Sequence, residues 1–299
     1  MKSIPTEEFS LTTPAVKKSR MRRGGWSWGP VEGVKLRVGS LGAGIQSTTL
    51  VLMAEHGEIG PKPDYWLYAP VGDARATREH LKWLAYSNVT TVPIVELDDP
   101  EITLRRAIQN RVEQNGQRGI SIPAYLSGKK DGQDRRQCTR EFKTDRLTAK
   151  QRELMGYKPR QRIPSGSCEV WIDYSTDEVV RAGAAFDPWV VHRFPLIEMR
   201  MTIGDCVAWL ERHGYPVPPR SKCTFCPYRT NAEWRWLKDN EPDNWVDAVE
   251  IDRLIRETPG MRAKSYLHVN RVPLDQVDLS TDEERGQGML MICEGACGV

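Results

Sequence analysis

A turn of small residues separates two apolar segments in the first fifth of the chain. It reads Ser40-Leu41-Gly42-Ala43-Gly44-Ile45-Gln46-Ser47, after an expected strand at 36–39 and before an expected helix at 47–56. The backbone N–H groups of Gly42, Ala43 and Gly44 and the N-terminus of the helix favour an anion. We expect the turn to hold a phosphate or sulfate group, with the Ser40 and Ser47 hydroxyls as further donors. The alternative is an ordinary glycine-rich connection.

Apolar segments of strand length and of helix length alternate along the residues that follow. This alternation predicts an α/β fold with a Rossmann-like, doubly wound parallel sheet, which binds ligands outside the carboxyl ends of its strands. The turn at 69–73 then lies beside the Ser40 turn and adds Gly72 and Asp73 to the site. We expect Asp73 either to bind Mg²⁺ or to cap the next helix. Further strands are expected at 65–68, 91–96 and 170–172, and helices at 75–86, 102–114, 141–154 and 202–213.

Three segments follow from the composition along the chain. Residues 1–33 are rich in basic residues and lack apolar periodicity, which predicts an irregular arm. Residues 34–200 contain the alternating pattern and are expected to form the α/β domain. Residues 201–299 are expected to form a smaller helical region that carries a C-x-x-C sequence and a cysteine-containing tail.

Hydropathy and cysteine content limit the classes of protein to which the chain can belong. No apolar run approaches the roughly 20 residues that a membrane span needs, so we expect a cytoplasmic protein with no membrane partner. The chain has seven cysteines and no recognisable signal peptide. An odd number of cysteines in this setting argues against a disulfide framework and favours metal binding or thiol chemistry.

Positive charge is concentrated in one strip of the sequence. Residues 129–162 contain 12 Lys or Arg against 5 Asp or Glu, although the whole chain has a net charge of only +3. A strip of this kind suits a polyanion such as a nucleotide or a nucleic acid. A solvated helix face is the alternative.

Three cysteines are candidates for metal or cluster ligands. Cys223 and Cys226 form the C-x-x-C pair, whose thiolates can reach one metal or cluster. One such pair is half a zinc site, and the sequence has no second C-x-x-C or close histidine pair. Cys138 is flanked by arginine and lysine residues that favour the thiolate.

The Ser40 turn resembles the PP-loop of the adenine nucleotide alpha-hydrolase group, written S-x-S-G-G-x-D-S. Ser40, Gly42, Ala43, Gly44, Gln46 and Ser47 fall on the motif positions, with Gln46 where the family has Asp. The resemblance implies that residues 34–200 bind an adenine nucleotide, either ATP or adenylyl sulfate. In ATP-splitting members the acidic residue helps to organise metal and pyrophosphate, so Gln46 weakens the case for ATP cleavage more than the case for nucleotide binding.

The cysteine pattern resembles that of phosphoadenosine phosphosulfate (PAPS) reductase-like proteins of phage and plasmid type. In the adenylylsulfate-reducing branch, a Cys-Cys pair, a lysine and a later C-x-x-C bind a four-iron four-sulfur cluster. Cys138, Lys143, Cys223 and Cys226 fall on these positions, and Thr139 replaces the second cysteine. The resemblance implies a 4Fe–4S cluster, with zinc as the alternative.

Cys206 and Cys297 are two further candidates for a role in this pattern. Cys206 is the best candidate for a fourth ligand, and a buried apolar cysteine is the alternative, since apolar residues share its helical face. Cys297, in the tail, resembles the cysteine with which sulfonucleotide reductases attack the sulfur of the bound nucleotide. A tail of exposed thiols is the alternative there.

Three functions remain open at this stage. In the favoured one, an ATP-using sulfur transferase adenylates a tRNA or DNA acceptor, Lys143 and Arg140 neutralise developing charge, and sulfur arrives through the cluster or Cys297 from a donor such as a cysteine desulfurase. In the second, a sulfonucleotide reductase releases sulfite with thioredoxin. In the third, a non-catalytic module stabilised by zinc binds nucleic acid.

Overall fold

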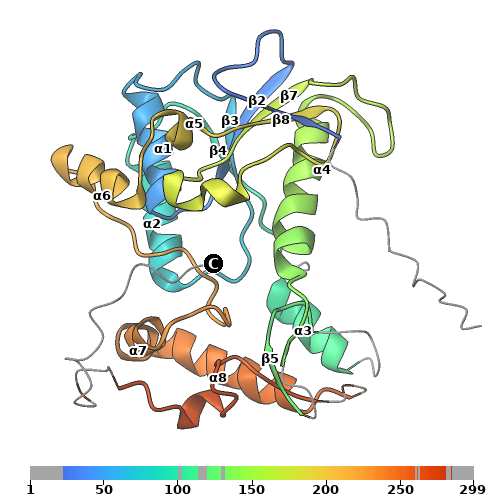
Figure 1. Cartoon of the computed structure of the whole chain (residues 1–299), viewed down its shortest axis with the longest axis vertical. Helices are drawn as coiled ribbons and strands as arrows, with labels where there is room; N and C mark the ends of the chain where they lie inside the picture. Colours follow the sequence, from blue (N-terminus) through green and yellow to red (C-terminus); the bar gives the residue numbers. More distant parts are fainter. Residues whose placement is uncertain are drawn as a thin grey trace, which may run out of the picture.

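The computed structural model describes residues 23–99, 103–113, 120–128, 132–259, 261, 263–280 and 284. An upper part contains the large β-sheet and a lower part is mainly helical, with helix α4 descending from the first toward the second (Figure 1). None of the described helices is both long enough and apolar enough to cross a bilayer. Cys297 and its tail lie outside the described residues.

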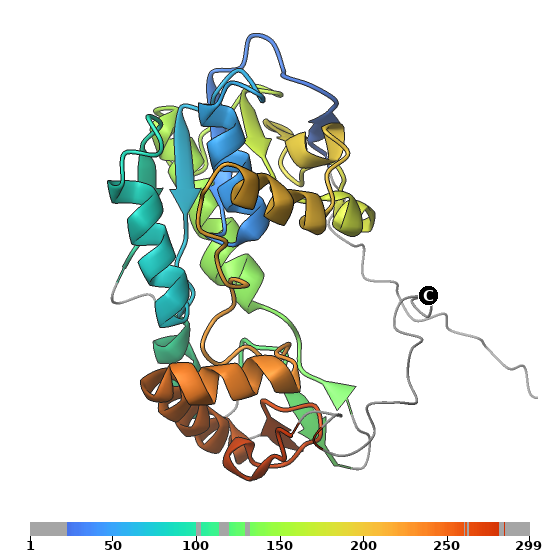
Figure 2. The same ribbon diagram turned by 90° about the vertical axis from the view of Figure 1, so that its left-hand side faces the viewer.

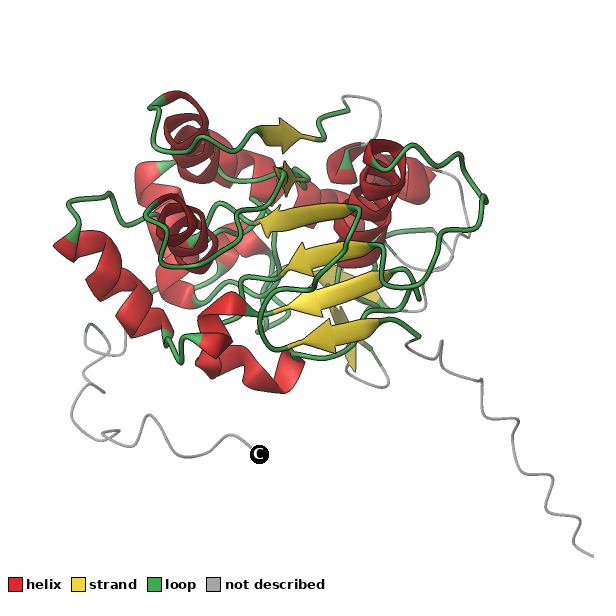
Figure 3. Ribbon diagram, turned by 90° about the horizontal axis from the view of Figure 1, so that it is seen from above, coloured by secondary structure: helices red, strands yellow, loops and turns green. Residues whose placement is uncertain are grey.

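Six strands form one all-parallel sheet, which confirms the predicted α/β fold of Rossmann-like order. Seen from above, several neighbouring strands of the sheet lie side by side with their arrowheads at the same end (Figure 3). Their spatial order is β1-β8-β7-β2-β3-β4. The strands are β1 (Gly25–Ser27), β2 (Leu36–Leu41), β3 (Tyr65–Tyr68), β4 (Ile94–Glu96), β7 (Cys168–Trp171) and β8 (Val190–Arg193).

Helices cover both faces of this sheet. Successive side chains of a strand point to opposite faces, so Trp66 packs in the cluster under α1 and α6 whereas Leu67 packs on the α4 side. Gly39 on β2 makes room for this packing, because a Cβ atom there would stand 1.9 Å from the Trp66 ring. The helices around the sheet are α1 (Ile45–Glu55), α2 (Arg75–Tyr86), α4 (Asp145–Leu154), α5 (Pro195–Glu198) and α6 (Ile203–Arg212), together with the 3₁₀ turn η2 (Thr176–Arg181).

The direction of winding reverses between β2 and β7. From β2 the chain moves outward through β3 to β4, and it later returns to place β7 on the other side of β2. In open α/β sheets, ligands bind at the carboxyl ends of the strands where such a reversal opens a crevice. The Ser40 turn begins within the last two residues of β2, Ser40 and Leu41, and therefore lies at this point.

The lower part has its own apolar core. Residues 104–142 and residues 223–279 both contribute to it, including Ile108, Phe142, Trp234 and Ile251. The lower core thus draws on both sides of residue 200, where the composition suggested a boundary. Figure 2 shows α7 and α8 packed across the base of the molecule. Its elements are α3 (Leu104–Glu113), α7 (Asn231–Asn240), α8 (Pro242–Arg256), the 3₁₀ turn η3 (Leu274–Gln276) and the antiparallel strands β5 (Tyr125–Ser127), β6 (Gly132–Gln133) and β9 (Lys264–Tyr266).

The local predictions differ in accuracy. The strand at 65–68 and the helix at 75–86 have the predicted bounds. The expected helix at 141–154 is in fact a π-helical turn, η1 (Thr139–Thr144), followed by α4. Strand β1 lies in the segment expected to be irregular, because it pairs with β8 at the edge of the sheet.

A buried carboxylate links three strands of the sheet. Glu169 on β7 is fully buried and accepts hydrogen bonds from Arg37 Nε at 2.7 Å and from Trp171 Nε1 at 2.6 Å. It also accepts from the backbone N–H of Val31, and Arg193 on β8 lies 3.9 Å away. The cations and N–H donors together offset the cost of burying this charge.

We predict that Glu169→Gln lowers the free energy of unfolding by about 3 kcal/mol, because the amide leaves Arg37 without a buried counter-charge. Chemical denaturation measures the loss. Glu153→Gln is the matched control, since that exposed glutamate pairs with Lys150 on α4 and should change stability by less than about 0.5 kcal/mol. Equal effects of the two substitutions would contradict the assigned role of Glu169.

Candidate functional site

A cavity of about 800 Å³ opens at the carboxyl ends of β2 and β7. The Ser40 turn and the residues after β7 form one wall. The η1 turn and the first part of α4 form a second wall, and the segment 220–228 closes the third. The cavity therefore brings together parts of the chain that are almost two hundred residues apart in sequence.

The Ser40 turn has the geometry of a small-residue cradle. Ala43 lies in the left-handed region with φ of +52° and is fully buried, and Gly44 is the N-cap of α1. The Ser47 hydroxyl accepts from the Gly44 N–H at 3.0 Å and donates to the Gly44 carbonyl at 3.1 Å. Ser40, Gly42, Gly44 and Ser47 line the cavity. The first turn of α1 thus adds its N–H groups and its dipole to this wall.

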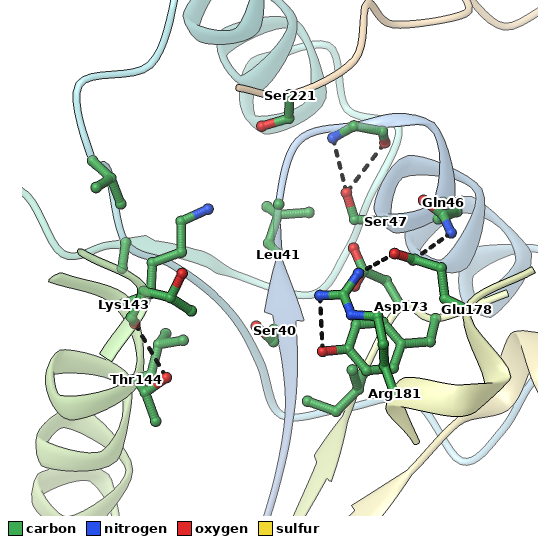
Figure 4. A pocket seen from close by; sticks show the side chains of 18 of the residues that line it. Ser40, Leu41, Gln46, Ser47, Lys143, Thr144, Asp173, Glu178, Arg181 and Ser221 are labelled. Carbon is green, nitrogen blue, oxygen red and sulfur yellow. Dashed lines mark hydrogen bonds and ion pairs between the residues drawn. The ribbon is translucent and has the colours of Figure 1, made fainter. Parts of the chain in front are cut away.

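Gln46, at the acidic position of the PP-loop motif, is held by polar neighbours (Figure 4). Its Nε2 donates to Ser175 Oγ and to Glu178 Oε2, both at 2.9 Å. A carboxylate at this position could donate neither hydrogen bond and would face the charge of Glu178. The local environment therefore favours a neutral amide.

The site contains an acidic residue that the sequence interpretation missed. Asp173 follows β7, lines the cavity and has Oδ2 3.4 Å from where a Cβ of Gly42 would stand. Burial raises the pKa of Asp173 to about 6, although the positive charge of Lys143 acts in the opposite direction. A single strand-end aspartate gives no signal in the sequence until β7 is placed beside β2.

Lys143 and Arg140 occupy different positions relative to the cavity. Lys143 lines the cavity opposite Asp173 (Figure 4), whereas Arg140 is exposed and lies 3.8 Å from Asp145. Both residues belong to the π-helical turn η1. A π-helical turn contains more residues than an α-helical one, so residues three apart no longer share a face. Both cations were expected to act on the ligand, but Arg140 is not among the residues lining the cavity.

Cys138, Cys223 and Cys226 all line this cavity, as the sequence pattern suggested. A hydrogen bond from the Cys223 thiol lowers the pKa of Cys226 to about 6. The same bond, together with burial, raises the pKa of Cys223 well above its usual range, and the nearby charge of Cys138 acts in the same direction. A Cys226 thiolate that accepts a hydrogen bond from the Cys223 thiol therefore faces the space beside the Ser40 turn, and Cys138 lines the same cavity.

The C-x-x-C turn is docked on the loop that follows β3. Cys223 pairs with Asp73 as an isolated β-bridge, and the Thr224 N–H donates to the Gly72 carbonyl at 2.8 Å. Gly72 has φ of +81°, and a Cβ there would stand 3.3 Å from the Phe225 ring. The close approach of the two loops thus depends on a glycine at position 72.

Asp73 lines the cavity and does not cap α2. Its Oδ2 accepts from the Tyr68 hydroxyl at 2.7 Å and from the Val71 N–H at 3.0 Å. The first two N–H groups of α2 donate instead to Glu241, at 3.0 and 2.7 Å. The helix-cap alternative for Asp73 was therefore wrong, and its role as a Mg²⁺ ligand stays a prediction.

Cys206 and Cys168 lie elsewhere. Cys206 is fully buried in the cluster between α1 and α6, and burial raises its pKa to about 12. Cys168 is fully buried on β7. Neither is among the residues that line the cavity, so the structure places Cys206 as the buried apolar cysteine of the alternative interpretation.

The three cavity cysteines do not form a compact set of metal ligands, either with one another or with other described residues. In the described part of the chain, no set of three metal-binding groups that includes a cysteine has all its ligand atoms within 4.8 Å. Thiolates around a single zinc ion lie closer than this, because each is about 2.3 Å from the metal.

Comparison with models of known protein families found no match, and neither did comparison with curated proteins or with solved structures.

We predict that Gln46→Glu lowers the free energy of unfolding by about 1 kcal/mol, because it places a second carboxylate beside Glu178. Adding Glu178→Gln should restore a donor–acceptor pair and recover most of the loss. Denaturation of the wild type, both single variants and the double variant gives the coupling energy. Strictly additive effects would contradict the contact.

Proposed function

We propose that this protein is an adenine-nucleotide-binding enzyme of sulfur chemistry, related to the PAPS reductase-like proteins, that uses ATP to transfer sulfur to a nucleic acid. One observation supports the proposal above all. A single cavity is lined by the Ser40 turn, by Lys143 and by the three cysteines Cys138, Cys223 and Cys226. Phosphate binding and sulfur chemistry would therefore take place in one space.

The proposed roles follow from position in the cavity. The N–H groups of the Ser40 turn and of the first turn of α1 would hold phosphate oxygens, and Lys143 would neutralise charge that develops on them. Cys138, Cys223 and Cys226 would hold an iron–sulfur cluster. When bound, that group supplies an iron able to bind sulfide or to carry electrons.

The proposed reaction has two balanced steps. A carbonyl oxygen of the acceptor base attacks the α-phosphorus of ATP, pyrophosphate leaves, and the oxygen becomes adenylated. Hydrosulfide then adds to the same carbon, the carbon–oxygen bond breaks, AMP leaves with the oxygen, and a thiocarbonyl remains. No net oxidation occurs, so the second step needs only a sulfide donor.

A nucleic-acid acceptor is favoured by the residues on the third wall of the cavity. Arg136 lies over the ring of Tyr228, 5.5 Å from its centroid, and Tyr228 is 41% exposed. Both residues line the cavity together with the exposed Arg220, whereas Lys222 in the same wall is paired with Glu233 at 2.6 Å. An exposed aromatic ring among cations can stack a base while the cations bind the backbone.

A sulfonucleotide reductase is the second candidate. It is favoured by the neutral Gln46, because reduction does not require cleavage between the phosphates of ATP. In that reaction a cysteine thiolate attacks the sulfur of adenylyl sulfate, AMP leaves, and a dithiol such as thioredoxin releases sulfite as it is oxidised to the disulfide. Cys297 would be the attacking residue.

Anaerobically purified protein should distinguish these functions. We expect release of AMP and pyrophosphate from ATP that depends on tRNA or DNA and on sulfide, with the thiolated base identified by mass spectrometry. Sulfite release from adenylyl sulfate with thioredoxin, abolished by Cys297→Ala, would establish the reductase instead. Absence of both reactions in cluster-loaded protein would contradict an enzymatic role.

Cysteine variants test the ligand assignment in the same assay. Cys138→Ala and Cys223→Ala should each lower the turnover rate by at least about a hundredfold and remove the visible absorption of the cluster. Cys206→Ala is the matched control, and we expect this variant to keep the wild-type turnover rate and the visible absorption of the cluster. Loss of the absorption in Cys206→Ala alone would return that residue to the ligand set.

We predict that ATP binds more tightly as the pH falls through about 6, because Asp173 becomes neutral there and no longer repels phosphate. Asp173→Asn should bind about tenfold more tightly above that pH and should remove this contribution. Calorimetry without divalent cations measures the affinity of each protein for ATP as a function of pH. The protonation of ATP itself affects both proteins equally, so it cancels when the two profiles are compared. Parallel pH profiles would contradict the prediction.

A further inference from the structure

A second group of metal-ligating side chains lies away from the cavity, where the ends of α1 and α6 meet. His56 is the C-cap of α1, Glu58 follows it, and His213 is the C-cap of α6. One ring nitrogen of each histidine and one carboxylate oxygen of Glu58 lie within 4.8 Å of one another. None of the three residues lines the cavity described above.

Neighbouring side chains orient all three groups. His213 Nδ1 lies 2.8 Å from the Trp209 carbonyl, and His56 Nε2 lies 2.9 Å from the Tyr215 hydroxyl. The Trp209 indole N–H donates to both carboxylate oxygens of Glu58, each at 3.2 Å. Each histidine thus keeps one ring nitrogen outside these bonds. Metal-binding histidines are usually held in this way, with the other nitrogen bonded to a carbonyl or another polar group.

Aromatic packing holds the group in place. The His213 ring is stacked on Trp209 with centroids 4.0 Å apart, and the His56 ring meets Trp209 edge-on at 5.3 Å. Trp209 is 3% exposed and belongs to the core under the sheet. The two imidazoles therefore rest on a fixed surface, whereas their outer edges face solvent.

We propose that His56, Glu58 and His213 bind a divalent transition-metal ion, with Zn²⁺ as the best fit. Two imidazoles and one carboxylate are a usual ligand set for zinc, with water in the fourth position. Tetrahedral ligands about 2.1 Å from the metal stand about 3.4 Å apart, so a contraction of at most about 1.4 Å would bring the three ligand atoms into range. The ion would join the end of α1 to the end of α6 and fasten the helix that begins at the Ser40 turn.

Co²⁺ binding to the full chain tests this site. After chelation and gel filtration, we expect one equivalent of Co²⁺ whose spectrum lacks thiolate charge-transfer absorption, because the ligands are nitrogen and oxygen. Any Co²⁺ held by cysteines of the cavity would show that absorption, so the two sites are distinguished in one spectrum. Zn²⁺ at a hundredfold excess over its Kd should raise the unfolding midpoint by about 5 °C.

Variants assign the ligands and their support. His213→Ala and His56→Ala should each weaken Co²⁺ binding at this site by at least about tenfold, and Tyr215→Phe should weaken it by about tenfold because it frees the His56 ring. Glu211→Gln is the matched control, since that exposed glutamate is on the same helix and outside the group, and it should bind as the wild type does.

Two results would overturn the proposal. One is His56→Ala and His213→Ala proteins that bind nitrogen- and oxygen-ligated Co²⁺ as tightly as the wild type. The other is a wild-type spectrum in which every bound Co²⁺ shows thiolate absorption. Circular dichroism of each variant confirms that it is folded, and a folded variant with unchanged binding counts against the site. Neither result bears on the nucleotide chemistry proposed for the cavity.

Discussion

The candidate site depends on the contact between the C-x-x-C turn and the loop after β3. The hydrogen bond from Thr224 to Gly72 and the backbone pairing of Cys223 with Asp73 join the lower part of the molecule to the loop at the carboxyl end of β3. Glu241 strengthens the same junction, because it accepts the first N–H groups of α2. Without this contact, the thiols would have no fixed position relative to the Ser40 turn.

Patterns that are local in the sequence were enough to predict much of the fold and one wall of the site. Apolar periodicity placed β3 and α2 correctly, and the small residues between Ser40 and Ser47 marked the turn after β2. The spacing of Cys138, Lys143 and the C-x-x-C pair also selected residues that line one cavity. These signals succeed because each depends on neighbours in sequence or on a recognisable motif.

Other parts of the site depend on contacts between segments far apart in sequence. Asp173 and Glu178 reach the Ser40 turn only because β7 pairs with β2, and a sequence does not state which strands are neighbours. Lys143 lines the cavity and Arg140 does not, although both belong to the π-helical turn η1, which the sequence did not predict. His56 and His213 are 157 positions apart, and the packing of α6 on α1 brings them together.

The mixed origin of the lower core has a consequence for how the protein is made. Leu104, Ile108 and Ile120 are buried in the same cluster as Trp234 and Ile251, so they stay exposed until those later residues have been synthesised. On a ribosome, the strands of the large sheet would emerge well before the partners of α3, and an apolar surface would stay open until α7 and α8 have been synthesised. A fragment ending near residue 200 should therefore aggregate, so the sheet and the cysteine region are best expressed as one piece.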